Sequence, residues 1–225
     1  KRENKSNIED EREREKEKER DKDESRIKGR ISFIGHSLGG LVIRKCLEES
    51  CMAPLLPHCY TFLSLASPHL GTLYADSQLV STGMKVLFRW KGFPILQELN
   101  LGDITDNDLT TSALYSLSEN GVLQYFQFIV LVSSPKDQYV PEYSARMQVS
   151  PRAEADATTG PAIVKMAANL MSQIEPERVI RLTLTNNIGG AVNVDTVIGR
   201  AAHVCYLANS AIADQIIYSI YPYFL

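Results

Sequence analysis

The first residue that could act in catalysis is Ser37, which lies in the run Gly35-His36-Ser37-Leu38-Gly39. An apolar stretch precedes this run, and residues 41–47 follow it with helical spacing. A sharp strand-to-helix turn lifts a serine hydroxyl clear of a sheet and aims the first helical N–H groups at developing negative charge. The pattern predicts a nucleophilic serine, with the backbone N–H of Leu38 as an oxyanion donor. The alternative is a glycine-rich turn that only joins two elements.

A serine hydroxyl needs a base, and the base needs an acid that orients it. The chain has four histidines. His36 adjoins the serine and cannot reach back to its hydroxyl, whereas His58 and His69 come too early for the chain order Ser, Asp, His of α/β-hydrolase triads. The predicted base is therefore His203, which we expect on a loop after the last apolar strand candidate, residues 179–184.

The acid is expected just past the preceding strand. Residues 128–132 form a continuous apolar run, typical of a strand that is buried on both faces of a parallel sheet. The turn-rich loop after it carries one carboxylate before Glu142, that of Asp137, which we predict to be the acid. Turn loops also use aspartate only to bond their own backbone. Three competing aspartates follow no strand and fit helix caps or solvated surface better, namely Asp103, Asp106 and Asp108.

Four segments carry a resemblance to a known family: Ile34–Gly39, Phe62–Tyr74, Asp137–Pro141 and Ile198–His203. Together they resemble the lipase-like serine esterases of the α/β-hydrolases, and most closely the C-terminal domain of the family-with-sequence-similarity-135 proteins. The resemblance runs from Ile31 to Leu225. It implies an α/β-hydrolase fold, a mostly parallel sheet flanked by helices. It also implies a cofactor-free serine hydrolase whose substrate is a small-molecule acyl ester or a lipid.

One part of the family pattern is missing before the strand-to-helix turn that carries Ser37, which is called the elbow below. The second oxyanion donor normally comes from an earlier loop with a His-Gly pair, but residues 1–30 contain neither that pair nor an apolar strand. We therefore expect an N-terminally truncated α/β-hydrolase domain whose elbow strand lies at a sheet edge. Two alternatives to an active esterase stay open: a catalytically impaired scaffold that binds a lipid or protein partner, and an acyltransferase.

The remaining sequence suggests a tail, a domain and a cap. Residues 1–26 are a charged low-complexity tail, 27–225 form the hydrolase domain, and the mostly apolar stretch from about 73 to 120 resembles a helical cap. Apolar cap residues suit an acyl pocket. For His69 the alternative is a histidine that bonds a nearby carbonyl and stabilises its turn. The candidates for substrate contact are His36, Pro68, His69, Phe88 and Trp90.

Composition narrows the function classes. The net charge is −3, and no basic stripe remains outside the tail, which argues against nucleic acid. No apolar run is long enough to span a bilayer, and peripheral membrane contact is left open. We expect a cytoplasmic location, because the few cysteines in a chain of this length suit a reducing compartment. The four cysteines fit neither a zinc site nor a disulfide scaffold, and Cys46 is expected to be buried. Further helices are expected over 161–174 and 208–221, and loops over 50–57 and 150–160.

Overall fold

Four apolar segments of the sequence form one parallel sheet. The computed structural model describes residues 29–75, 94–106, 108–185, 203–204, 206 and 209–225. Because the strands follow the chain order and all neighbours are parallel, their C-terminal ends share one rim of the sheet. The predicted α/β class is confirmed. The strands are β1 (Ile31–His36), β2 (Cys59–Leu65), β3 (Phe128–Ser133) and β4 (Val179–Thr183).

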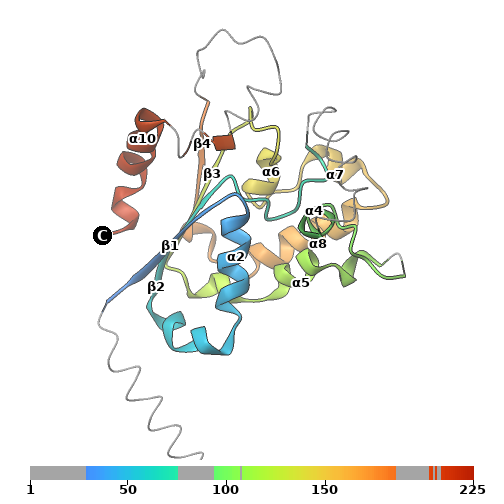
Figure 1. The fold of residues 1–225 in the computed structure, drawn as a ribbon, viewed down its shortest axis with the longest axis horizontal. Helices are drawn as coiled ribbons and strands as arrows, with labels where there is room; N and C mark the ends of the chain where they lie inside the picture. The colour runs from blue at the N-terminus through green and yellow to red at the C-terminus, as the bar shows by residue number, and fades with distance from the viewer. Residues whose placement is uncertain (1–28, 76–93, 107, 186–202, 205, 207–208) are drawn as a thin grey trace, which may run out of the picture.

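Helices cover both faces of the sheet (Figure 1). On one face, the apolar sides of α2 (Leu38–Leu47), α5 (Ala113–Glu119) and α8 (Gly160–Met171) join a core that includes Phe62 and Phe126. Nearly every residue of β2 and β3 is buried because both sheet faces are covered. The continuous apolar run at 128–132 therefore has the setting that its composition predicts.

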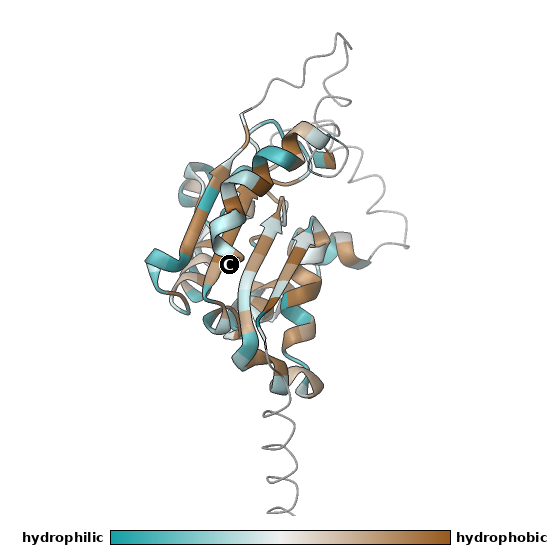
Figure 2. Cartoon of the chain, turned by 90° about the vertical axis from the view of Figure 1, so that its left-hand side faces the viewer, coloured by the Kyte–Doolittle hydropathy of each residue, from teal (hydrophilic) through white to brown (hydrophobic). Residues whose placement is uncertain are grey.

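The opposite face packs against α10 (Ser210–Ile220), which crosses the sheet in Figure 2. Ile212, Ile216 and Ile220 recur every four residues, so they share one side of the helix, and all three are buried. They meet the side chains of β2 and β3 that point away from α2. Asn209 caps the helix by accepting the N–H groups of residues 211 and 212.

Two segments that were predicted to be loops contain helical turns. Residues 150–160 hold α7 (Pro151–Ala155), because Ser150 caps it by accepting the N–H of Ala153 and the proline occupies its first turn. Residues Ser50–His58 form a 3₁₀ helix rather than a loop.

Cys46 is exposed, which corrects the expectation of a buried cysteine, because it lies off the apolar stripe of α2. The other short helices are α4 (Pro94–Leu99) and α6 (Glu142–Ala145).

β1 lies at the edge of the sheet in the described part of the chain, as expected for the elbow strand. Ile34 pairs with Leu63 in register, yet Ile34 is 62% exposed and is not among the residues that pack in the cluster around α10. Among the described residues, none of the helices combines the length and the apolar character that a bilayer crossing requires.

The predicted cap is described only in part. The described residues between 94 and 119 include α4, a 3₁₀ turn and α5, and Leu99, Leu114 and Leu117 are buried in the same core as the sheet. These leucines therefore pack in the core, as most apolar residues do. Phe88 and Trp90 lie outside the described residues, as does the predicted tail over 1–26.

Candidate active site

Ser37 sits in the turn between β1 and α2 with a strained backbone. Its φ of 55° and ψ of −124° fall where residues with a Cβ are disfavoured. The N–H of Ser37 donates to the carbonyl of Leu65 at 2.9 Å, which ties the turn to the end of β2. The helix begins at Leu38, so its first N–H groups have no partner one turn earlier in the helix. This is the elbow geometry that the sequence predicts.

Two glycines make this turn sterically feasible. A Cβ on Gly35 would lie 2.6 Å from the backbone N of Gly40, and a Cβ on Gly40 would lie 2.3 Å from Oγ of Ser67. Gly39, the second glycine of the motif, has open space where a Cβ would lie, so the closure of the turn does not depend on it. Gly40 takes the second role because it is the residue of α2 that faces the turn after β2.

A pair of alanine substitutions tests this assignment. Gly35→Ala should lower the free energy of unfolding by about 1–3 kcal/mol, because the clash is with backbone that no rotamer change can relieve. Gly39→Ala should raise it by about 0.5–1 kcal/mol, because alanine restricts the unfolded chain and its Cβ meets nothing outside the helix. Urea unfolding of both variants measures the difference. Equal effects of the two substitutions would contradict the steric argument.

The structure brings the three predicted chemical residues together at the common rim of the sheet. Nδ1 of His203 lies 2.7 Å from Oδ2 of Asp137, and its Nε2 lies 2.9 Å from Oγ of Ser37. An ionised carboxylate only accepts hydrogen bonds, so Nδ1 carries the proton and Nε2 is left to accept the serine hydroxyl. Contrary to the expected loop, His203 and Val204 have helical backbone.

The carboxylate of Asp137 is buried and held from two sides. Its Oδ1 accepts the N–H groups of Tyr139 at 2.8 Å and Val140 at 3.1 Å, while Oδ2 faces the imidazole. The loop thus uses the aspartate for its own turn and for His203 at once. Of the competing aspartates, Asp108 caps a 3₁₀ turn through the N–H of Thr110, and Asp103 accepts the N–H of Ala113.

The imidazole of His203 also lies close to two other rings. Its centroid is 5.1 Å from that of His36 and 5.4 Å from that of Tyr139. Nε2 of His36 lies 2.8 Å from the carbonyl oxygen of His203. The predicted substrate contact His36 is therefore engaged with the backbone of the histidine segment.

Pro68 and His69 are both buried. Nδ1 of His69 lies 3.3 Å from Nη1 of Arg44, and its Nε2 lies 2.8 Å from Oγ of Ser64. Since a guanidinium only donates, Nδ1 accepts and Nε2–H donates to the serine oxygen. These contacts fit the structural alternative for His69, although its partners are side chains rather than the expected carbonyl.

Arg44 is a fully buried cation that the sequence analysis missed. It lies on α2 beneath the elbow and also donates through Nη2 to the carbonyl of Leu117 on α5. Burial lowers the pKa of Arg44 to about 9. Burial and the neighbouring charge of Arg44 hold the pKa of His69 well below its ordinary value of 6.5. A signal was present, because Arg44 falls midway between Leu41 and Leu47 on the apolar stripe of the helix.

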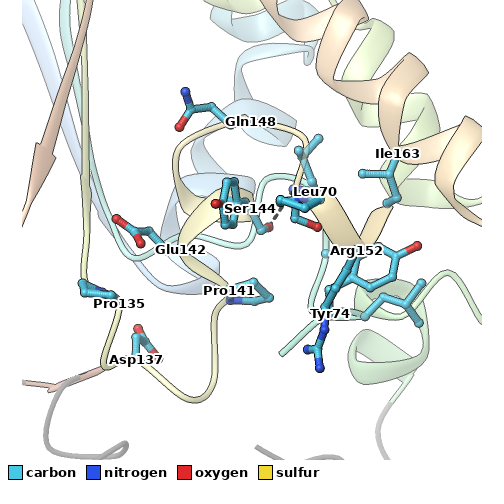
Figure 3. A pocket seen from close by; sticks show the side chains of 15 residues that line it. Leu70, Tyr74, Pro135, Asp137, Pro141, Glu142, Ser144, Gln148, Arg152 and Ile163 are labelled. Atoms are coloured by element: carbon cyan, nitrogen blue, oxygen red, sulfur yellow. Dashed lines mark hydrogen bonds between the residues drawn. The ribbon is translucent and has the colours of Figure 1, made fainter. Parts of the chain in front are cut away.

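A cleft of about 230 Å³ opens beside the loop that carries Asp137, at the rim of the sheet where the strands end (Figure 3). Asp137 and Glu142 lie on one side of it, and Tyr74 and Arg152 lie on the other. The hydroxyl of Tyr74 donates to Asp156 at 2.9 Å, which fixes that wall to the turn between α7 and α8. In the described part of the chain, no group of three or more His, Cys, Asp or Glu side chains could hold a metal ion.

Comparison with protein families adds an independent finding. The model of the family described as "Putative serine esterase (DUF676)" matches residues 9–151 of the chain. The matched range includes the elbow, the turn after β2 and the loop of Asp137, and it ends before the segment that carries His203.

Proposed function

The chain belongs to the serine esterase family DUF676, and we propose that it hydrolyses carboxylic esters of lipid or other acyl type through Ser37, His203 and Asp137. The contacts of 2.9 Å and 2.7 Å that join the three side chains support the proposal. So does the strained elbow, whose φ of 55° a serine adopts only where the surroundings enforce it. Within this proposal the fold is a lipase-like α/β-hydrolase related to the C-terminal domain of the family-with-sequence-similarity-135 proteins. The proposed domain spans 27–225, with a cap over about 73–120.

The proposed reaction has two halves. Oγ of Ser37 attacks the ester carbonyl carbon while Nε2 of His203 takes its proton, and the tetrahedral oxyanion accepts the N–H of Leu38. The imidazolium then gives that proton to the leaving alkoxide, which departs as the alcohol. Water attacks the acyl-serine in the same way, with His203 as base again, and releases the acid and free Ser37. Asp137 holds the tautomer and stabilises the imidazolium throughout.

A fluorophosphonate probe tests whether Ser37 is activated. The wild-type chain should form one covalent adduct and release nitrophenolate from p-nitrophenyl butyrate, whereas Ser37→Ala should lose the adduct and at least 10³-fold of the hydrolysis rate. Ser219→Ala, which removes an exposed hydroxyl on α10, is the matched control and should retain both. Mass spectrometry of the labelled peptide identifies the site.

The same experiment separates the alternatives. A chain that folds but takes no label would support the impaired scaffold that binds a lipid or protein partner. A chain that takes the label and, with added alcohols, yields new esters in place of the free acid would be an acyltransferase. The cytoplasmic location and the peripheral membrane contact stay predictions.

A further inference from the structure

We propose that His36 is a positioning residue, whose Nε2–H bonds the carbonyl of His203 and holds the imidazole in line with Ser37. The inference rests on the proposed esterase function and adds a residue to its machinery. Its basis is a side-chain-to-backbone contact of 2.8 Å between residues 167 positions apart. That contact ties the segment of His203 directly to the elbow strand.

The chemistry of the contact fixes the proton on His36. A carbonyl oxygen only accepts, so the hydrogen must lie on Nε2 of His36. The other nitrogen, Nδ1, is then free of a proton in the neutral ring. His36 therefore acts as a donor towards the backbone, and it does not compete with His203 for the proton of Ser37.

The contact supplies a restraint that the hydrogen bonds of the His203 ring to Asp137 and Ser37 do not. The bonds to Asp137 and Ser37 orient the ring, but both act at the end of a rotatable side chain. The bond from His36 acts on the main chain of His203 and so fixes where that side chain starts. A misplacement of about 1 Å in a catalytic group can cost on the order of 10²-fold in rate.

His36 is well placed to provide this restraint because its own position is rigid. It is the last residue of β1, in register with Leu65 of β2. The next residue, Ser37, bonds the carbonyl of Leu65 through its N–H. The same few residues thus carry the nucleophile and anchor the base, so the distance between them depends on a strand end rather than on a long connection.

Three substitutions separate the effect of losing the hydrogen bond from the effect of changing the side-chain volume. His36→Gln places an amide N–H at about the reach of Nε2, His36→Asn carries the same amide on a shorter side chain, and His36→Leu has no donor. We expect kcat of the Asn and Leu variants to fall by about 10- to 100-fold with KM within about twofold, and the Gln variant to stay within about threefold of wild type. The fluorophosphonate rate constant should follow kcat.

His58 provides the matched control. Its Nδ1 lies 3.3 Å from the carbonyl of Gly29, a similar histidine-to-backbone contact at the opposite end of the sheet. His58→Leu should leave kcat unchanged. The inference fails if the Asn and Leu variants keep wild-type kcat, or if the Gln variant is as impaired as the Leu variant. An inert wild-type chain would instead refute the esterase function, so the two failures are distinguishable.

Discussion

Asp137→Asn should lower kcat by about 10⁴-fold while leaving the fold intact. Oδ1 of Asp137 accepts two backbone N–H groups, and an asparagine keeps its carbonyl oxygen there because its amide would oppose both donors. The NH₂ group must then face Nδ1 of His203. That nitrogen can only accept, so the proton moves to Nε2 and blocks the lone pair that Ser37 needs. Steady-state hydrolysis of p-nitrophenyl butyrate measures the loss.

Asp108→Asn is the control for this prediction. Asp108 competes with Asp137 in the sequence but caps a surface turn, and asparagine caps equally well. Its substitution should change kcat by less than about twofold. A drop at Asp108, or near-normal turnover of Asp137→Asn with an unchanged melting temperature, would rule out the proposed acid.

His69→Leu should lower the free energy of unfolding by about 2–4 kcal/mol at pH 7.5. The leucine removes the acceptor of Arg44 and the donor to Ser64, so a fully buried cation loses one of its partners. His69→Gln should cost much less, because its amide oxygen and nitrogen are spaced like the two ring nitrogens and are able to serve both partners. Arg44→Met in the His69→Leu background should recover part of the loss, because no buried charge then lacks an acceptor.

The same histidine predicts a pH dependence. The unfolded chain takes up a proton on His69 near pH 6.5, whereas the folded chain does so only at much lower pH. Stability from this group is therefore complete above about 6.5 and falls below it, by up to about 1.4 kcal/mol per pH unit. Urea unfolding between pH 7.5 and 5 should show this extra slope for the wild type and not for His69→Gln. Identical slopes would show that His69 titrates alike in both states.

Much of the architecture follows from local sequence patterns. The strand at 128–132 was predictable because a run buried on both faces has no polar alternation. Ser37, Asp137 and His203 were found because each follows a strand candidate and the three occur in the chain order of α/β-hydrolase triads. The structure brings them into contact, and their catalytic roles are the proposal. Neither inference needed any knowledge of tertiary packing.

Three of the missed features depend on partners that are distant in the sequence. The role of Gly40 comes from Ser67, that of His36 from the carbonyl of His203, and that of Arg44 from His69 and α5. No periodicity encodes such pairings. The helix α7 was missed for a different reason, since its cap Ser150 and the following proline are equally common in turns.

The backbone conformation of Ser37 places catalytic activity and thermal stability in conflict. Glycine would relieve the disfavoured conformation at position 37 and would also delete the hydroxyl. Selection for thermal stability alone would therefore favour glycine at position 37 and lose the nucleophile. Laboratory evolution of this chain must select for turnover at the same time.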